Sequence, residues 1–119
     1  METELISQLA KFGFTQNEAK AYLILLKHCP ATGYEVSQHS GVPRSAIYEI
    51  LRKLELGGVV YSEGRKLVHY FPIPPEQLAI QLTSRFEHNI HDLKDKLSEL
   101  NTPSSDKQTW NIKGYSSMM

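Results

Sequence analysis

The stretch of sequence that decides the fold reads SGVPRSAIYEILRKLELGG and occupies residues 40–58. Pro43 suits the first turn of a helix, because a residue there needs no amide donor. Gly57 and Gly58 tolerate a positive φ and are expected to end the helix. The apolar residues between them recur at helical spacing and predict one buried face, made of Ile47, Ile50, Leu51 and Leu54. We therefore predict a helix over about residues 43–56 whose opposite face is available to a partner.

Three helices are expected before this one. The first has apolar residues at helical spacing ahead of Gly13, namely Leu5, Ile6, Leu9 and Phe12. The second begins at a capping-box pattern, in which Thr15 and Glu18 can satisfy each other's free backbone amides, and it ends before Pro30. Its buried face is predicted to comprise Ala19, Tyr22, Leu23 and Leu26, with Leu25 at the margin.

The third predicted helix is short and leads into the turn before Pro43. Thr32 is a suitable N-cap residue for it. The helix carries Tyr34, Val36 and Ser37 and is expected to end at Ser40-Gly41.

Beyond Gly58 the hydrophobic period changes from helical to alternating. Runs rich in β-branched and aromatic residues cover residues 59–63 and 66–71 on either side of Gly64-Arg65, and they predict a β-hairpin that prolines end. Helix, helix, short helix, turn, helix and hairpin is the order of a winged helix-turn-helix. We therefore predict a mainly α fold with a small β-hairpin over residues 1–74.

A long helix is predicted from about residue 75 to residue 100. From Phe86 onward its apolar residues fall alternately four and three positions apart, which is the heptad spacing of a coiled coil. The helix could instead fold back on its own domain, and the sequence leaves that alternative open. We interpret residues 75–101 as a dimerisation helix whose seam consists of Leu82, Phe86, Ile90, Leu93, Leu97 and Leu100.

The charge balance differs along the chain. The 119 residues carry 13 basic and 13 acidic side chains, so the formal net charge is zero. Residues 1–74 carry eight basic and seven acidic side chains, residues 75–101 carry three and five, and residues 102–119 carry two and one. A weakly basic domain is thus joined to an acidic helix, and the neutral total does not exclude nucleic-acid binding.

The remaining features of the composition favour a cytoplasmic protein made of one small domain and an appendage. No apolar run approaches the roughly 20 residues of a membrane span, so we expect no membrane association. The N-terminus METELISQL is acidic and amphipathic, unlike a secretory signal. Cys29 is the single cysteine, so no internal disulfide can form.

The outward face of the helix over residues 43–56 carries side chains that can read or hold DNA in the major groove. Arginine pairs with guanine, serine serves either base, and tyrosine meets phosphate or a thymine methyl. Arg44 and Ser45 lie in the first turn, which enters the groove first, whereas Arg52 and Lys53 are expected nearer to phosphate. The hairpin over residues 59–71 forms the wing, and its tip adds two more cations. The predicted DNA-binding set is therefore Thr32, Arg44, Ser45, Tyr48, Arg52, Lys53, Arg65 and Lys66.

The number of basic residues bears on the number of copies that bind. Tight binding to a specific site usually neutralises about 6–10 phosphates, whereas one copy offers roughly five suitably placed cations. Two copies joined through the heptad helix would suffice and would prefer a nearly palindromic site. We therefore predict a homodimer whose partner is double-stranded DNA.

Several stretches resemble TrmB-type transcriptional regulators. Residues 13–23, GFTQNEAKAYL, resemble the family's opening pattern G-L-T-x-x-E-A-x-x-Y, and residues 40–54 resemble its turn and recognition helix. Gly58-Val59-Val60 is similar to the entry to the wing, and residues 70–76, YFPIPPE, are similar to its exit. The resemblance covers about residues 10–100. It implies a winged-helix DNA-binding domain, a coiled-coil dimerisation helix and a role in transcriptional control.

The resemblance also implies a C-terminal effector domain that binds sugars or other small ligands. The first strand of that domain often starts with a tryptophan and a nearby glycine, and Trp110-Asn111-Ile112-Lys113-Gly114 looks similar. We interpret residues 102–119 as a linker and a possible start of this domain. The chain stops at Met119, as a natural short form or a truncation, so a small-molecule effector is expected only if the missing domain exists.

Parts of the sequence are also compatible with functions other than DNA binding. A winged helix can bind a protein through the same outer face, and the neutral charge and acidic long helix favour that alternative. An exposed helix also often carries such residues with no partner at all. His88 and His91 are spaced like metal ligands, but a polar coiled-coil flank has the same pattern. No phosphate loop, HExxH or nucleophile-elbow pattern occurs, so we predict no enzyme activity, no cofactor and no metal.

Overall fold

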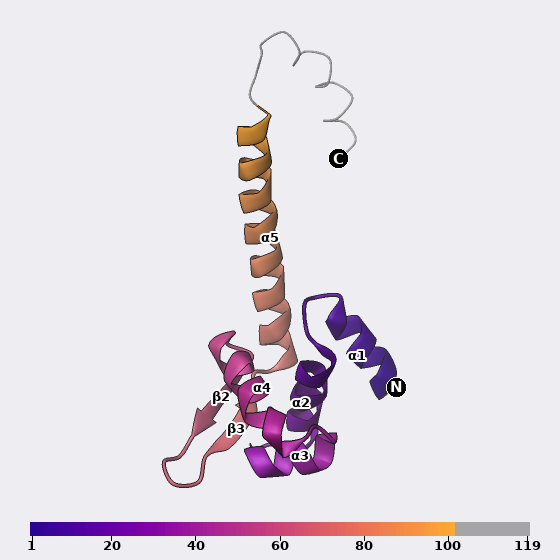
Figure 1. Ribbon diagram of the computed structural model, residues 1–119, viewed down its shortest axis with the longest axis vertical. Coiled ribbons are helices and arrows are strands. Elements are labelled where there is room, and N and C mark those ends of the chain that lie inside the picture. The colour runs from indigo at the N-terminus through magenta and orange to yellow at the C-terminus, as the bar shows by residue number, and fades with distance from the viewer. Residues whose placement is uncertain (102–119) are drawn as a thin grey trace. The chain divides into compact units, whose positions relative to one another are not determined.

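The computed structural model describes residues 1–101, which form five helices and three short strands (Figure 1). In chain order these are α1 Glu2–Ala10, α2 Gln16–Lys27, β1 Ala31–Thr32, α3 Gly33–Ser40, α4 Arg44–Leu56, β2 Val60–Glu63, β3 His69–Pro72 and α5 Pro75–Leu100. The chain divides into two compact units, residues 1–82 and residues 83–119. The predicted fold, mainly helical with a hairpin and a long C-terminal helix, is confirmed. The linker and tryptophan motif expected within residues 102–119 lie outside the described residues.

Side-chain caps determine where α2 and α3 begin. The Thr15 hydroxyl accepts a hydrogen bond from the Glu18 amide at 3.1 Å, and the Glu18 carboxylate accepts one from the Thr15 amide at 2.9 Å. The predicted capping box is therefore confirmed, and Thr32 and Glu35 form a second one at α3. Pro43 is the N-cap residue of α4 and not part of its first turn, because its ψ of 145° is not helical.

The core of the unit formed by residues 1–82 lies around α2. This helix contacts α1, α3, α4 and β3, so its buried surface is wider than one helical stripe. As a result Leu25 is fully buried and Leu26 is 41% exposed, which reverses the burial predicted for these two residues. The rest of the core comes mainly from Val36, Val42, Ile47, Leu51, Leu54, Val59, Val60 and Leu78.

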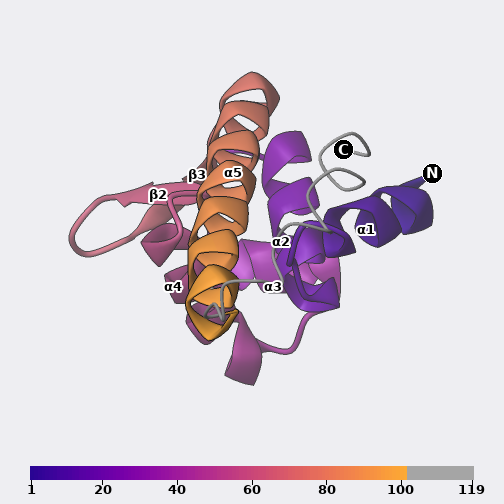
Figure 2. The same ribbon diagram turned by 90° about the horizontal axis from the view of Figure 1, so that it is seen from above.

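α1 covers this core with a narrower face than the sequence predicts. Ile6 and Leu9 pack against the core, but Phe12 lies beyond the end of the helix and is 55% exposed. The hairpin and α1 lie on opposite sides of this unit (Figure 2). None of the helices described within residues 1–101 is both long and apolar enough to cross a membrane.

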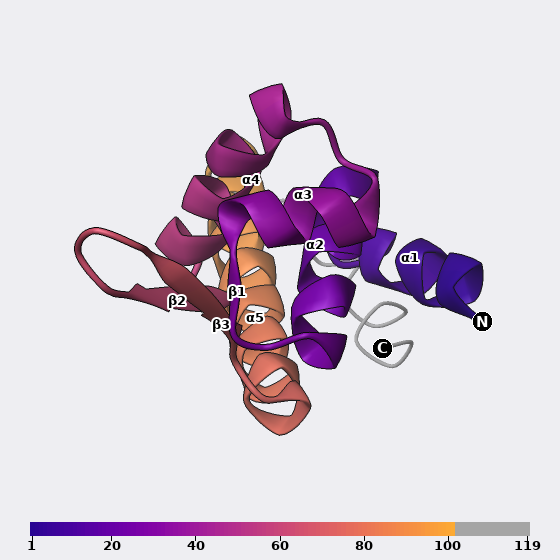
Figure 3. The ribbon, with the colours of Figure 1, turned by 90° about the horizontal axis from the view of Figure 1, so that it is seen from below.

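The strands form one antiparallel sheet in the order β1-β3-β2. The sequence did not predict β1, which pairs Ala31 with Tyr70 and Thr32 with His69. Figure 3 shows β1 beside β3 and leading directly into α3. The strand predicted from residue 66 begins only at His69, because the chain folds back over Gly64, where φ is +110°.

α5 begins as part of the first unit. Leu78 is buried and Leu82 is half-buried against the core. The segment before α5 is held by Tyr22, whose hydroxyl donates a hydrogen bond to the Ile73 carbonyl oxygen at 2.8 Å. Burial, together with the charge of Glu76, raises the pKa of Tyr22. The long helix is confirmed over Pro75–Leu100.

Candidate nucleic-acid interface

α4 turns one face into the core and the other to solvent. Ile47 and Leu51 are fully buried, and Leu54 is 4% exposed. The residues predicted to point outward are all exposed: Arg44, Ser45, Tyr48, Glu49, Arg52 and Lys53. The structure therefore confirms their exposure, while their contacts with DNA stay a prediction.

The turn between α3 and α4 fixes how α4 is presented. Gly41 ends α3 with a φ of 81° in the left-handed region, a conformation that glycine adopts at little cost. The buried Ser37 hydroxyl donates a hydrogen bond to the Val42 carbonyl oxygen at 2.6 Å. The Ser40 hydroxyl accepts a bond from the Val42 amide at 3.1 Å. These bonds pair both backbone polar groups of Val42 with side chains of α3.

Arg44, the first residue of α4, lies against α3. Its guanidinium carbon is 5.0 Å from the centre of the Tyr34 ring, within the range of a cation–π interaction. The Tyr34 hydroxyl in turn accepts a hydrogen bond from Gln38 Nε2 at 2.8 Å. The predicted set omitted Tyr34 and Gln38. Their spacing of four residues was visible in the sequence, but their proximity to Arg44 depends on the packing of two helices.

Tyr48 of α4 lies close to Gly33, the first residue of α3. It is 51% exposed, yet a Cβ atom built on Gly33 would overlap its ring, coming within 2.7 Å of Cζ. Gly33 therefore makes room for the Tyr48 ring. Part of the ring serves the packing of the two helices, and the rest belongs to the exposed face.

Arg52 forms an ion pair with Glu49 on the same face of α4. Arg52 Nη2 lies 2.5 Å from Glu49 Oε2, and Arg52 Nε lies 3.2 Å from Glu49 Oε1. The hydrogen bond from Arg52 lowers the pKa of Glu49, and the same bond raises the pKa of Arg52. A phosphate group that approaches Arg52 must therefore compete with a carboxylate that already occupies two of its donors.

The wing is attached to α4 by a side-chain hydrogen bond. Ser62 of β2 donates from its hydroxyl to Glu55 of α4 at 2.7 Å. Within the wing, the rings of Tyr61 and Phe71 stack across the two strands with centres 5.1 Å apart. Arg65 and Lys66 are exposed in the turn at its tip. The structure thus places both predicted wing cations in solvent, on a hairpin held to α4.

Thr32 occupies a different position from the other predicted DNA-binding residues. It is half-buried, ends β1 and caps α3, and its hydroxyl accepts a hydrogen bond from the Glu35 amide at 3.1 Å. Its side-chain oxygen therefore already has a structural role. A contact between Thr32 and DNA stays a prediction.

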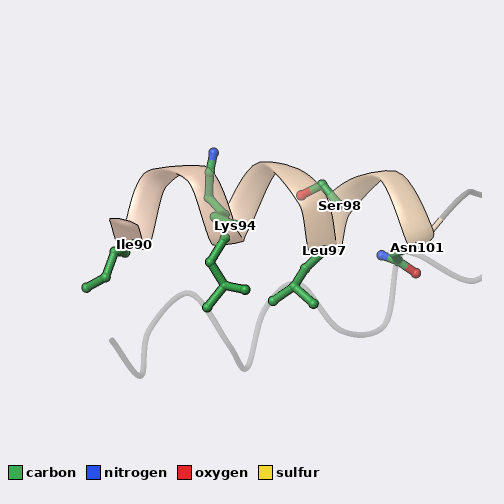
Figure 4. Close-up of a pocket in the computed structure, with 6 residues that line it drawn as sticks. Ile90, Lys94, Leu97, Ser98 and Asn101 are labelled. Atoms are coloured by element: carbon green, nitrogen blue, oxygen red, sulfur yellow. The ribbon is translucent and has the colours of Figure 1, made fainter. Parts of the chain in front are cut away.

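Five of the six predicted seam residues of α5 are strongly exposed. Leu82 differs, because it packs against the core of the first unit. The exposed fractions of the others run from 50% to 82%, for Phe86, Ile90, Leu93, Leu97 and Leu100. Ile90 and Leu97 point to one side of the helix and Lys94 to the other (Figure 4). An open pocket there is lined by Ile90, Leu93, Lys94, Leu97, Ser98 and Asn101.

The polar flanks of α5 carry pairs of polar or oppositely charged side chains one helical turn apart. Lys96 lies 3.0 Å from Asp92, and His91 lies 3.4 Å from Asp95. Such pairs support an exposed helix. Within residues 1–101, no group of three or more His, Cys, Asp or Glu side chains is placed to hold a metal ion.

The comparisons with known proteins identify one matching family. Residues 9–76 match the family described as "Sugar-specific transcriptional regulator TrmB". The chain is 33% identical over 120 residues to the uncharacterized protein YrhO of Bacillus subtilis, covering 100% of this chain and 44% of YrhO. It is 34% identical over 105 residues to the sugar sensing transcriptional regulator TrmBL1 of Pyrococcus furiosus, covering 84% of this chain and 29% of TrmBL1.

A solved structure supports the fold. The structure of TrmBL2, an archaeal chromatin protein, superposes with a TM-score of 0.73 at 23% identity and covers 91% of this chain and 44% of TrmBL2. The chain thus spans less than half of the length of each of these three relatives. The fold is a winged helix, and the matching family is one of transcriptional regulators. With more than half of its residues matched, the chain belongs to the TrmB family of transcriptional regulators.

Proposed function

We propose that this chain acts as a homodimeric, sequence-specific DNA-binding regulator of transcription. The observation that carries the proposal is the exposure of the outer face of α4 and of the basic wing tip on elements joined by the Ser62–Glu55 hydrogen bond. α4 enters the major groove with Arg44 and Ser45 toward base edges. Arg65 and Lys66 meet the phosphate backbone beside it.

The remaining candidate residues of α4 have supporting roles. Tyr48 contacts a phosphate or a thymine methyl next to the bases that Arg44 and Ser45 read. Arg52 and Lys53 lie farther along α4 and meet phosphate. The names of relatives support this proposal, since TrmBL1 is called a transcriptional regulator and TrmBL2 of Thermococcus kodakarensis a DNA-binding transcriptional repressor.

The homodimer is proposed from the exposed seam on α5. Phe86, Ile90, Leu93, Leu97 and Leu100 repeat at heptad spacing, and each is at least half exposed. A second copy of the helix would cover these side chains by coiled-coil packing. Two copies also double the number of basic side chains available to one duplex. The expected binding site is therefore nearly palindromic, with one half-site for each copy.

The test is a selection of bound sequences from a random pool of DNA duplexes, followed by affinity measurements on the selected site. Arg44→Ala should relax the preference at one base pair in each half-site, with a loss of about 1–3 kcal/mol in discrimination. Arg65→Ala should weaken binding to all sequences alike. Lys11→Ala is the matched control, because it removes an exposed cation at the end of α1, outside α4 and the wing. Unchanged affinity and preference in both interface variants at low salt would contradict the proposed interface.

A second candidate function is binding of another protein through the same face. The Glu49–Arg52 ion pair favours this alternative, because it places a carboxylate among the cations of α4. The salt dependence of binding separates the two functions. Binding through several phosphates weakens steeply as salt rises, with a slope of about −0.9 for each phosphate neutralised. A chain that shows no salt-sensitive binding to duplex DNA supports the protein-binding alternative.

A further inference from the structure

Arg44 and Arg52 both belong to the exposed face of α4, but their guanidinium groups are held in different ways. Glu49 holds Arg52 through two hydrogen bonds, which occupy Nε and Nη2. Tyr34 holds Arg44 through the π face of its ring, 5.0 Å from the guanidinium carbon. A carboxylate uses the N–H donors of an arginine, whereas an aromatic ring attracts the cation and leaves those donors unused.

We propose that Tyr34 is the positioning residue that presents Arg44 to a base, an inference that rests on the proposed DNA-binding function. Recognition of guanine by arginine needs two in-plane N–H groups directed at N7 and O6. A guanidinium group held over a ring keeps these groups available at its edge. Tyr34 therefore restricts Arg44 to conformations from which it reads DNA, and it does so before DNA arrives.

The restriction reduces an entropic cost of binding. An unrestrained arginine side chain samples many rotamers and loses them when it forms a bidentate contact. The Tyr34 ring removes part of that freedom in the unbound protein. An exposed cation–π interaction corresponds to about a two- to five-fold change in an equilibrium constant, and we expect the discrimination at the Arg44 base pair to change by that factor in each half-site.

The ring itself is held in place from α3. Gln38 lies one turn after Tyr34 and donates a hydrogen bond from Nε2 to the tyrosine hydroxyl at 2.8 Å. α3 is fixed to the start of α4 by the Ser37–Val42 hydrogen bond in the turn. The tyrosine and the arginine thus come from two helices that are joined through this turn, and the contact between ring and guanidinium group spans the two helices.

The experiment compares base preferences in four variants of the full chain by the random-pool selection. Tyr34→Leu removes the π face, Tyr34→Phe keeps the ring and loses the hydroxyl, Arg44→Ala removes the reading group, and the fourth variant combines Tyr34→Leu with Arg44→Ala. Phe12→Leu serves as the matched control, since Phe12 is a similarly exposed aromatic residue, at 55% against 45%, and lies after α1, outside α4 and the wing.

The expected result has four parts. Tyr34→Leu reduces the preference at the base pair that Arg44→Ala identifies, by about two- to five-fold per half-site. Tyr34→Phe keeps most of the preference of the original chain, because the ring remains and only the hydrogen bond from Gln38 is lost. The double variant shows the preference of Arg44→Ala alone, because Tyr34 acts through Arg44. The control leaves the preference at that base pair unchanged.

Other outcomes overturn the inference. If Tyr34→Leu changes a different base pair, or if its loss adds to that of Arg44→Ala, Tyr34 contacts DNA independently. A Tyr34→Leu variant with unaltered preference, or an Arg44→Ala variant with unaltered preference, also excludes a positioning role. If the original chain selects no sequence at all, the proposed function itself fails. Circular dichroism and the melting temperature monitor folding, and Tyr34→Gln replaces the leucine variant if the latter melts early.

Discussion

The Gln81 side-chain amide donates a hydrogen bond to the Gly57 carbonyl oxygen, with 2.5 Å between Nε2 and O. Gly57 is the C-cap residue of α4, and Gln81 belongs to the part of α5 that packs with the first unit. A Cβ atom on the adjacent Gly58 would lie 3.3 Å from Gln81 Nε2, so the two segments approach closely. The beginning of the long helix is thereby attached to the end of the helix proposed to read DNA.

Gln81→Ala should lower the free energy of unfolding by about 1 kcal/mol, because it removes one partly buried hydrogen bond. Urea unfolding followed by circular dichroism measures the change. Gln77→Ala is the control, since Gln77 is an exposed glutamine on the same helix. Equal losses in the two variants would mean that the bond to Gly57 contributes nothing specific.

Glu49→Gln should increase the affinity for DNA of random sequence. The change releases Arg52 from its ion pair and removes a negative charge from the exposed face of α4. If Arg52 then neutralises one more phosphate in each copy, the salt dependence becomes steeper by about 0.9 per copy. Fluorescence anisotropy at several salt concentrations measures both quantities. Glu87→Gln makes the same charge change on α5, and an identical effect there would show that only net charge matters.

Leu93→Asp should dissociate the proposed dimer. Burying a leucine side chain contributes about 1.5–3 kcal/mol, and the change affects both copies while placing two charges in one seam. Analytical ultracentrifugation should show the mass of one chain, and DNA affinity should fall because a single copy has few cations. Ser84→Asp adds the same charge elsewhere on α5 and should keep the dimer. An unchanged mass for Leu93→Asp would contradict the coiled-coil seam.

The raised pKa of Tyr22 predicts how the free energy of unfolding changes at alkaline pH. Burial raises the pKa of Tyr22 and of Tyr70, so the folded chain keeps these protons at a pH where the unfolded chain loses them. The stability that comes from these groups is therefore fully present below pH about 10. It falls as pH rises through the raised pKa values of the folded state.

The variant Tyr22→Phe separates the contribution of Tyr22 from that of Tyr70. It should cost about 1 kcal/mol at neutral pH, through the lost bond to Ile73, and should make the alkaline loss of stability shallower. Urea unfolding between neutral pH and pH about 11 provides the measurement. Tyr61→Phe, at an exposed tyrosine, should do neither. A Tyr22→Phe variant as steeply pH-dependent as the original chain would rule out this contribution.

The parts of the fold that the sequence predicted are those that local signals determine. The capping box at Thr15, the apolar stripe of α4 and the length of α5 follow from spacing within one segment. β1 was missed because two residues carry no periodic pattern, and the strand exists only through pairing with β3. The burial of Leu25 and Leu26 was reversed because it depends on which helices surround α2.

In the candidate site, too, features determined within one segment were predicted, and features that depend on packing between segments were not. Helical periodicity correctly predicted which side chains of α4 are exposed. Periodicity could not place Tyr34 against Arg44, because this contact requires the packing of α3 on α4. The Glu49–Arg52 pair was accessible in principle, since the residues are three apart on one helix, but its two hydrogen bonds are a property of the folded side chains.

Thr32 combines two structural requirements in one residue. Its backbone pairs with His69 in the sheet, and its hydroxyl fixes the first turn of α3. In a library that replaces every residue in turn, serine would keep both the strand and the cap, while a residue with no side-chain oxygen would keep only the strand. This position should therefore show narrow tolerance to substitution even in a screen for folded protein without DNA. If substitutions of Thr32 abolish binding in a screen for DNA binding, the loss therefore reports impaired folding of the domain before it reports a lost contact with DNA.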